Sequence, residues 1–399
     1  MTKTDSPAMP TGRSAAPAGT RIVLFALAMG GFTIGTTEFA AMALVPYFSE
    51  GLGITEASAA YVIAAYALGV VIGAPLIAVL AARLPRRRLL AALMLLYGAA
   101  NLASGLAPNF ASLVALRFLG GLPHGAYFGI ATLLAAGMMA PGQRGRAISK
   151  IMMGLTVATI IGVPGANILG QTIGWRWCFA IAGALALATA AMIYAFAPRG
   201  TGTASDPLKE LDALKNRQVI LTLLFGAIGF GGMFAVYTYL ASTLEQVTGV
   251  APGIVPLYFS LFGVGMTLGT FVAGWATDLS LNGSTWGVLG GMTLLLAIYP
   301  AVTGSPLGMA VMALLIGGAG CLTIMLQTRL MMVAREAQTL AAALNHAALN
   351  VGNALGPWLT SLFLAAGYGL PVAGPVGAVL GVAGLALFAL TLWDERRAG

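Results

Sequence analysis

The sequence predicts an all-α membrane protein with twelve transmembrane helices in two halves of six, both chain termini being cytoplasmic. Of its 399 residues, 59% are hydrophobic and only 8% are charged, whereas soluble domains carry roughly 25% charged residues. The apolar residues fall in runs of the length, about 20 residues, that crosses the hydrocarbon core of a bilayer. The basic residues fall almost entirely in every second gap between these runs.

The first apolar run follows a Pro-, Ala-, Ser- and Thr-rich tail and continues from Ile22 through Val45. That length exceeds the core of a signal peptide, so we predict a retained span. The predicted spans begin at Ile22, Ala57, Leu89, Ala111, Ala147, Trp177, Gln218, Gly253, Trp286, Leu307, Thr339 and Pro371.

The longest polar gap, between Pro198 and Gln218, divides these spans six and six. The predicted organisation is a disordered cytoplasmic tail (1–20), a six-helix bundle (21–198), a cytoplasmic linker (199–217), a second six-helix bundle (218–393) and a cytoplasmic tail (394–399).

The distribution of basic residues predicts the orientation. With the N-terminus inside, 18 of the 20 Lys and Arg residues fall in cytoplasmic segments, and only Arg117 and Arg176 do not. This asymmetry is the positive-inside pattern of membrane proteins, and it predicts a multi-pass protein of the bacterial cytoplasmic (inner) membrane. The net charge of +8 therefore does not indicate a nucleic-acid partner, because the charges lie in short loops beside a lipid bilayer.

Several classes of function lack their sequence patterns. Cys178 and Cys321 lie far apart in apolar runs, so we expect neither a disulfide nor a metal site. The chain contains no G-x-x-x-x-G-K-[ST], H-E-x-x-H or G-x-S-x-G pattern, which argues against an ATP-driven pump and a hydrolase. The pair Gly263 and Gly265 lies inside an apolar run, so we interpret it as helix packing. No catalytic residue and no cofactor are predicted.

The two halves repeat each other's features. A Gly-Pro pattern marks the fifth span at Gly162-Val-Pro164 and the eleventh at Gly356-Pro357. Interrupted helices at matching places in two repeats are typical of secondary transporters that work by alternating access around a site near the membrane midplane.

Three strings in the first half resemble motifs of the major facilitator superfamily. They lie between spans two and three, in span four and in span five: Ala82-Arg83-Leu84-Pro85-Arg86-Arg87-Arg88, Arg117-Phe-Leu-Gly-Gly121 and Gly162-Val-Pro164-Gly165. Ala82 and Pro85 stand where the first motif usually has an acid and a glycine. Further strings are similar to the sugar-efflux and arabinose-efflux permeases, relatives of chloramphenicol exporters: Gly35-Thr-Thr-Glu38-Phe39, Pro85-Arg-Arg-Arg88, His124-Gly125, Gly174-Trp-Arg176 and Asn350-Val-Gly-Asn353.

This resemblance implies the major facilitator fold, a monomer, and export of a small organic compound such as a drug or sugar in exchange for protons. It also implies gating roles for five residues: Arg83, Arg86, Arg87, Asp278 and Pro164. The arginines can equally be positive-inside anchors, and Asp278 is expected to cap a helix and pair with loop arginines. The rival functions are an uptake symporter of the same fold and, remotely, a membrane-embedded enzyme or sensor.

Glu38 is the only acid well inside a predicted span, where ionisable groups are costly. It lies roughly 12 Å below the outer boundary, and Arg117 lies at roughly 10 Å by the same helical rise. A carboxylate in a low-dielectric site binds a proton readily, and a nearby arginine favours its release. We hypothesise that the two are coupled in proton exchange. The alternatives are a fixed ion pair or an arginine that binds backbone carbonyls.

His124 shares a helical face with Arg117 and Phe128, because the spacing is i, i+7 and i+11. Histidine titrates near physiological pH, so His124 is a candidate proton relay, although a neutral, hydrogen-bonded histidine fits as well. The predicted substrate-binding residues are Glu38, Tyr127, Phe128, Phe234, Tyr237, Asn345, His346 and Asn350. The aromatic residues among them can instead serve helix packing. Span eleven carries a polar stripe, His346, Asn350 and Asn353 with Asn345 alongside, which can instead hold helices together by hydrogen bonds.

Overall fold

A computed structural model describes residues 18–80, 84–139, 144–199, 215–334 and 338–398, whose regular elements are all helices. The elements are α1 (Ala18–Ala43), α2 (Val45–Leu52), α3 (Glu56–Leu80), α4 (Arg86–Gly105), α5 (Phe110–Gly121), α6 (His124–Gly137), α7 (Arg144–Val157), η2 (Ala158–Gly162), α8 (Val163–Thr172), α9 (Trp175–Phe196), α11 (Arg217–Thr238), α12 (Leu240–Gln246), η4 (Pro252–Ile254), α13 (Val255–Leu279), α14 (Leu281–Val302), α15 (Pro306–Gly318), η5 (Ala319–Cys321), α16 (Leu322–Val333), α17 (Gln338–Ala365), η6 (Leu370–Val372) and α18 (Ala373–Ala398).

Each predicted span begins within five residues of the first residue of a helical segment in the structure. Eleven segments of the described chain are long and apolar enough to cross a membrane. The remaining predicted span corresponds to α17, whose polar residues make it less apolar than the eleven. The count of twelve spans, the cytoplasmic placement of the termini and the domain boundaries therefore stay predictions.

Local sequence signals explain where helices begin and end. The Asn109 side chain accepts a hydrogen bond from the Ser112 backbone N–H and so caps α5. Ser305 caps α15 in the same way, with Pro306 at the first helical position, where its missing N–H costs nothing. Gly174 joins α8 to α9 with φ at 99°, a conformation that other residues adopt only with strain.

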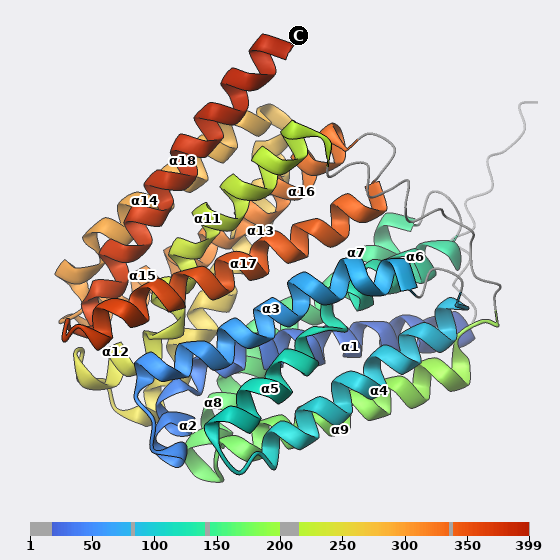
Figure 1. Ribbon diagram of the computed structural model, residues 1–399, viewed down its shortest axis with the longest axis horizontal. Helices are drawn as coiled ribbons and strands as arrows, with labels where there is room; N and C mark the ends of the chain where they lie inside the picture. The colour runs from blue at the N-terminus through green and yellow to red at the C-terminus, as the bar shows by residue number, and fades with distance from the viewer. Residues whose placement is uncertain (1–17, 81–83, 140–143, 200–214, 335–337, 399) are drawn as a thin grey trace, which may run out of the picture.

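The helices form two groups, α1 to α9 and α11 to α18, that meet along a seam (Figure 1). At this seam α3 lies beside α17, and α13 contacts η2 and α8. The described N- and C-terminal residues lie at the same end of the bundle, and we call the opposite end, where α2, α8 and α12 lie, the outer end. The central cavity described below lies between the two groups.

Glycines allow the helices to approach closely within each group. A Cβ added to Gly121 of α5 would lie 2.0 Å from the backbone oxygen of Tyr66 in α3, and one on Gly73 would lie 2.0 Å from that of Leu122. Gly356 of α17 approaches the Gly231 oxygen of α11 similarly. In lipid, such small-residue contacts hold helices together because apolar burial gives no driving force between them.

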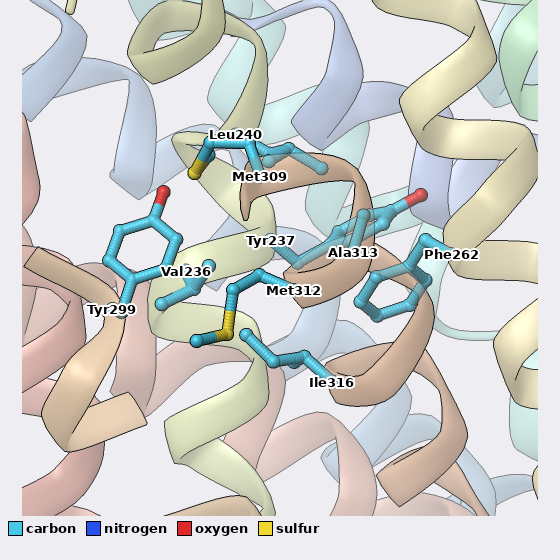
Figure 2. A pocket seen from close by; sticks show the side chains of 9 residues that line it. All are labelled: Val236, Tyr237, Leu240, Phe262, Tyr299, Met309, Met312, Ala313 and Ile316. Carbon is cyan, nitrogen blue, oxygen red and sulfur yellow. The ribbon is translucent and has the colours of Figure 1, made fainter. Parts of the chain in front are cut away.

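The outer part of the second group is densely packed. Figure 2 shows Val236, Tyr237, Phe262, Tyr299 and their neighbours around a void of only about 10 Å³. That space is about one water molecule in size, and its walls are almost wholly apolar. No passage for a solute runs through the described residues here.

The fifth predicted span contains a π-helical turn instead of a simple kink. Residues of η2 widen the helix immediately before Pro164, which lies in the first turn of α8. Proline has no N–H, so it cannot bond the carbonyl of Ile160, four residues earlier. The Ser260 hydroxyl of α13 donates to that carbonyl at 3.1 Å, which joins the two groups at this turn.

Candidate functional site

A cavity of about 510 Å³ lies between the two groups and extends from Glu38 toward the end of the bundle that carries the termini. Both groups contribute to its wall. Arg117, Tyr127 and Tyr237 do not line it, whereas the other seven of the ten predicted proton-coupling and substrate residues do. These seven are Glu38, His124, Phe128, Phe234, Asn345, His346 and Asn350.

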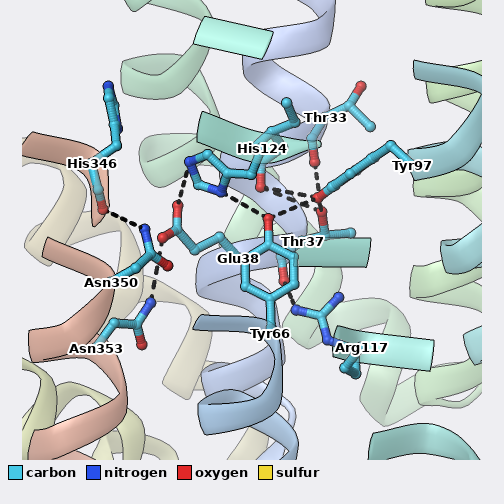
Figure 3. A network of polar contacts seen from close by, with 11 residues as sticks. Thr33, Thr37, Glu38, Tyr66, Tyr97, Arg117, His124, His346, Asn350 and Asn353 are labelled. Atoms are coloured by element: carbon cyan, nitrogen blue, oxygen red, sulfur yellow. Dashed lines mark hydrogen bonds and ion pairs between the residues drawn. The ribbon is translucent and has the colours of Figure 1, made fainter. Parts of the chain in front are cut away.

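Glu38 lies at the seam near the end of α1, with only 8% of its surface exposed. Its Oε1 accepts a hydrogen bond of 3.3 Å from Asn353 Nδ2 of α17, which joins the two groups. Its Oε2 lies 4.0 Å from His124 Nε2 (Figure 3). No lysine or arginine forms an ion pair with this carboxyl among the described residues.

A chain of hydrogen bonds leads from His124 away from the cavity (Figure 3). His124 Nδ1 lies 2.9 Å from the Tyr66 hydroxyl, which lies 3.4 Å from the Tyr97 hydroxyl. Tyr97 in turn bonds the Thr37 hydroxyl. With Tyr66 donating to Nδ1, the ring hydrogen of His124 is on Nε2 and faces Glu38. Four helices, α1, α3, α4 and α6, supply the four members.

Arg117 does not form an ion pair in the described chain, although its depth matches that of Glu38. Its Nη2 donates to the backbone oxygen of Thr37 at 3.4 Å and its Nη1 to Asn101 Oδ1 at 3.5 Å. Its guanidinium carbon lies 4.2 Å from the centre of the Tyr66 ring. The alternative of a fixed ion pair with Glu38 is therefore not found here, and Arg117 instead binds a backbone carbonyl, that of the residue before Glu38.

Aromatic rings close the cavity at two places. Phe128 of α6 stacks on His346 of α17, with ring centres 5.1 Å apart and an angle of 6°. Phe39 contacts Phe234 at 6.1 Å and Tyr237 edge-on at 5.7 Å. Both contacts join one group to the other, so they must change if the groups move relative to each other.

Two of the predicted substrate residues lie away from the cavity wall. The Tyr127 hydroxyl donates to the Leu27 backbone oxygen at 2.8 Å and is fully buried. Tyr237 lies behind Phe39 and packs against Phe262 with ring centres 4.4 Å apart. The sequence pattern showed that these rings were in spans but not which side of the helix they occupied. The structure therefore gives both a packing role in this conformation.

Helix α17 carries buried amides whose oxygens have no partner, and two of them, Asn345 and Asn350, line the cavity. Asn345 Oδ1, Asn350 Oδ1 and Asn353 Oδ1 are all buried without a hydrogen bond. Their nitrogens are bonded: Asn350 Nδ2 to the His346 backbone oxygen at 3.0 Å, and Asn345 Nδ2 to Thr323 Oγ1 at 3.5 Å. Because a buried acceptor without a donor is costly, these oxygens favour a ligand with hydrogen-bond donors.

Hydrogen bonds between the groups close the outer end. The Tyr47 hydroxyl donates to Glu245 at 3.0 Å, and Gln246 donates to Glu56 at 2.9 Å. Burial, reinforced by the charge of Glu245, raises the pKa of Tyr47 to about 12, so this hydroxyl remains a donor at neutral pH. A Cβ on Gly263 of α13 would lie 2.5 Å from the Thr159 oxygen, so only glycine permits this approach.

The predicted gating residues have different surroundings. Arg83 lies outside the described residues. Arg86 Nη1 donates to the Leu133 backbone oxygen at 3.3 Å, and Arg87 lies 4.8 Å from the centre of the Tyr194 ring. Both contacts stay within the first group, and the choice between gating and anchoring stays a prediction.

The expectation that Asp278 caps a helix is wrong, because Ser280 accepts from the Gly283 N–H at the start of α14. Asp278 is exposed, and no ion pair to it is found among the residues described. The charged network at this end is elsewhere. Arg329 binds Glu395 at 3.0 Å, and Arg217 binds Asp394 at 3.0 Å, which fixes α18 against α16 and α11.

Sequence reasoning missed several members of the polar network. Tyr66, Tyr97 and Asn101 are single polar residues on α3 and α4, and nothing in the sequence indicates that they converge on α1. Asn353 belongs to the predicted polar stripe, but its contact with Glu38 crosses 315 positions of the chain. No group of three or more metal-ligating side chains occurs in the described part of the chain.

Comparison with known proteins places this architecture in a family. Residues 27–331 match the family model described as Major Facilitator Superfamily. The chain is 37% identical over 367 residues to the inner membrane transport protein YdhP of Escherichia coli K12, covering 91% of this chain and 94% of that one.

Two further relatives have names that refer to resistance or efflux. The chain is 33% identical over 350 residues to a chloramphenicol resistance protein of Streptomyces lividans, covering 86% and 88% of the two chains. It is 27% identical over 370 residues to a probable sugar efflux transporter of Helicobacter pylori, covering 92% and 93%.

A solved structure has the same fold. The crystal structure of a bacterial homologue of the human lysosomal transporter Spinster, inward-facing and unoccupied, superposes with a TM-score of 0.68 over 95% of both chains at 18% identity. The likeness at this identity concerns the fold.

Proposed function

The chain belongs to the major facilitator superfamily, and we propose that it exports a small organic compound in exchange for protons by alternating access. It is a multi-pass transporter of the bacterial inner membrane and not an enzyme. The proton coupling, the outward direction and the cargo class, a drug, sugar or related metabolite, are the proposed parts.

The surroundings of Glu38 carry this proposal. It is the one acid among the residues that line the cavity, it is buried, and no lysine or arginine forms an ion pair with it among the described residues. The same carboxyl bonds Asn353 across the seam. Protonation removes its charge, and a cargo that donates a hydrogen bond to it competes with the proton. One group can therefore hold either a proton or cargo, which is the requirement for exchange.

The present conformation is closed at one end and has its cavity toward the other. Hydrogen bonds such as Tyr47 to Glu245 hold the outer ends of the groups together, while the cavity extends toward the ends that carry the termini. The positive-inside pattern assigns those ends to the cytoplasm. The cavity thus exchanges solutes with the cytoplasm in the present conformation, a state that an exporter and an uptake symporter share. The names of the Streptomyces and Helicobacter relatives, which refer to resistance and efflux, support export.

The function is tested in two steps. A drug-hypersensitive host that expresses the protein is grown on antibiotics, sugar analogues and nucleoside analogues to find a cargo. Purified protein in liposomes is then given an imposed proton gradient, and cargo flux and internal pH are followed together. We expect cargo to move against the direction of proton flow.

Glu38→Gln should abolish the gradient-driven flux, because glutamine keeps the size of the side chain but cannot ionise. Glu245→Gln is the matched control: this acid lies at the outer seam, and glutamine still offers Tyr47 an acceptor oxygen. Cargo that moves together with protons would indicate an uptake symporter. Full gradient-driven flux in Glu38→Gln would refute the role of this carboxyl.

A further inference from the structure

We propose that a second subsite, a groove between α3 and α17, holds the hydrocarbon part of an amphipathic cargo whose hydrogen-bond-donating head lies in the central cavity. This inference rests on the proposed function and narrows its cargo class. It predicts that the transporter takes compounds with a donor head and an apolar tail, which enter from the bilayer.

The groove lies on the seam, where α3 and α17 run side by side (Figure 1). Its volume is about 280 Å³, and Asn350 is the only polar residue in its wall. Ala64, Ala67 and Ala354 provide the space because their side chains are small. The other lining residues are Leu68, Val71, Val351, Leu355 and Trp358.

The groove faces the surroundings of the bundle at mid-span. Leu68 is 52% exposed, Trp358 is 39% exposed and Val351 is 38% exposed, and all three lie in helices of the bundle. On α3 the wall runs from Ala64 to Val71, a length of about 10 Å at the rise of an α-helix. A hydrocarbon chain fits such an apolar furrow, which a polar solute would have to enter without partners.

Asn350 connects the groove to the central cavity because it lines both. Its side chain is 2% exposed, and its Oδ1 has no hydrogen-bond partner. Two further acceptors belong to residues that line the cavity: the Glu38 carboxyl and Asn345 Oδ1. A head group at this junction therefore meets acceptors, and a tail that leaves the junction sideways meets only apolar side chains.

The chemistry of the two spaces selects the ligand. A fully apolar molecule would leave the Asn350 oxygen unpaired, and a fully polar one would leave the groove unfilled. A primary alkylamine satisfies both, because its ammonium group donates hydrogen bonds and its chain is apolar. The groove also lies where the two groups meet, so it must change shape when they move.

The test uses the full-length protein in lipid nanodiscs and a primary alkylamine with a diazirine at the end of its chain. After illumination, the labelled positions are mapped by mass spectrometry. We expect label on α3 and α17 at Leu68, Val71, Val351 or Trp358, and we expect unlabelled alkylamine to compete for it. Labelling needs no transport, so its failure and the failure of proton-coupled export are distinguishable.

Variants separate the tail from the head. Ala354→Leu and Ala64→Leu, which fill the groove from opposite sides, should each lower the label about tenfold, the effect of burying about two fewer methylene groups. Ala99→Leu is the matched control, because Ala99 is exposed on α4, which packs on α5, α6 and α9. A quaternary alkylammonium probe has no donor and should label weakly, and Asn350→Ala should remove the preference for the primary amine.

Three results would overturn the inference. Label spread evenly over all exposed helices would mean that the probe reports the bilayer alone. Label in the groove that excess alkylamine does not displace would mean that phospholipid chains occupy it. Equal labelling by the primary and quaternary probes would mean that the head group does not donate a hydrogen bond at Asn350.

Discussion

The two walls of the central cavity differ in how completely their polar groups are paired. The first wall is lined by α1, α6 and α7 and backed by α3, α4 and α5. In it, His124, Tyr66, Tyr97 and Arg117 bond each other or nearby backbone, and only the Nε atom of Arg117 among these four side chains has no partner. In the second wall, to which α17 contributes the amides, Asn345 and Asn350 keep buried oxygens without donors. Paired groups stabilise the fold, whereas unpaired acceptors favour ligands, so the first wall suits proton handling and the second suits cargo.

The largest loss of stability is expected for a substitution of Arg117, which is 1% exposed. Arg117→Met would leave the Asn101 and Thr37 oxygens without their donor and would remove the contact with the Tyr66 ring. We expect a loss of about 3 kcal/mol in the free energy of unfolding, measured by reversible unfolding in mixed micelles.

Arg117→Lys should not restore that stability, because lysine has no planar fork to reach two acceptors and lie over a ring. Arg176→Met is the control: Arg176 is only half-buried, although it also donates to backbone oxygens. It should cost about 1 kcal/mol. Equal losses in the two variants would show that the first wall is not a specially stabilised region.

The next effect concerns the hydrogen-bonded chain behind Glu38. Tyr66→Phe removes the partner of His124 Nδ1 and should cost about 1 kcal/mol of stability. It should also shift the pH dependence of transport, because the orientation and tautomer of His124 beside Glu38 are no longer fixed. The measurement is gradient-driven flux in liposomes across a range of pH.

Tyr127→Phe is the matched control for this variant. Tyr127 is as deeply buried and also loses one hydrogen bond, from its hydroxyl to Leu27, but it lies outside the chain that leads to Glu38. It should lower stability by a similar amount and leave the pH profile unchanged. If both variants shifted the pH profile, or neither did, the hydrogen bonds that lead from His124 to Tyr66 would have no specific role in proton coupling.

The sequence predicted the fold better than the site. Apolar runs of bilayer length are properties of continuous segments, so each predicted span begins close to where a helix begins. Of the two expected interruptions, a π-helical turn precedes Pro164, whereas the one at Pro357 is wrong because α17 continues through it. Glu38 and the polar stripe of span eleven could be recognised as candidate site residues because polar groups inside a span are costly. Tyr66 and Tyr97 were not, since their importance comes from contacts between helices. Tyr127 and Tyr237 illustrate the same limit, because a ring within a span can face either a cavity or a neighbouring helix.

The smallest stability effect, and the sharpest test of the second wall, is expected for amide deletions. Asn345→Ala removes an oxygen that is unpaired and one long bond to Thr323, so stability should change by only about 0.5 kcal/mol. The cargo concentration at half-saturation should rise about tenfold, the value of one hydrogen bond to a buried partner, with the pH profile unchanged.

Asn101→Ala is the counterpart in the first wall, where the amide bonds Tyr97 and Arg117. It should cost about 2 kcal/mol of stability and leave half-saturation unchanged. If the two deletions affected stability and half-saturation equally, pairing would not distinguish the walls, and cargo would have to bind through groups common to both.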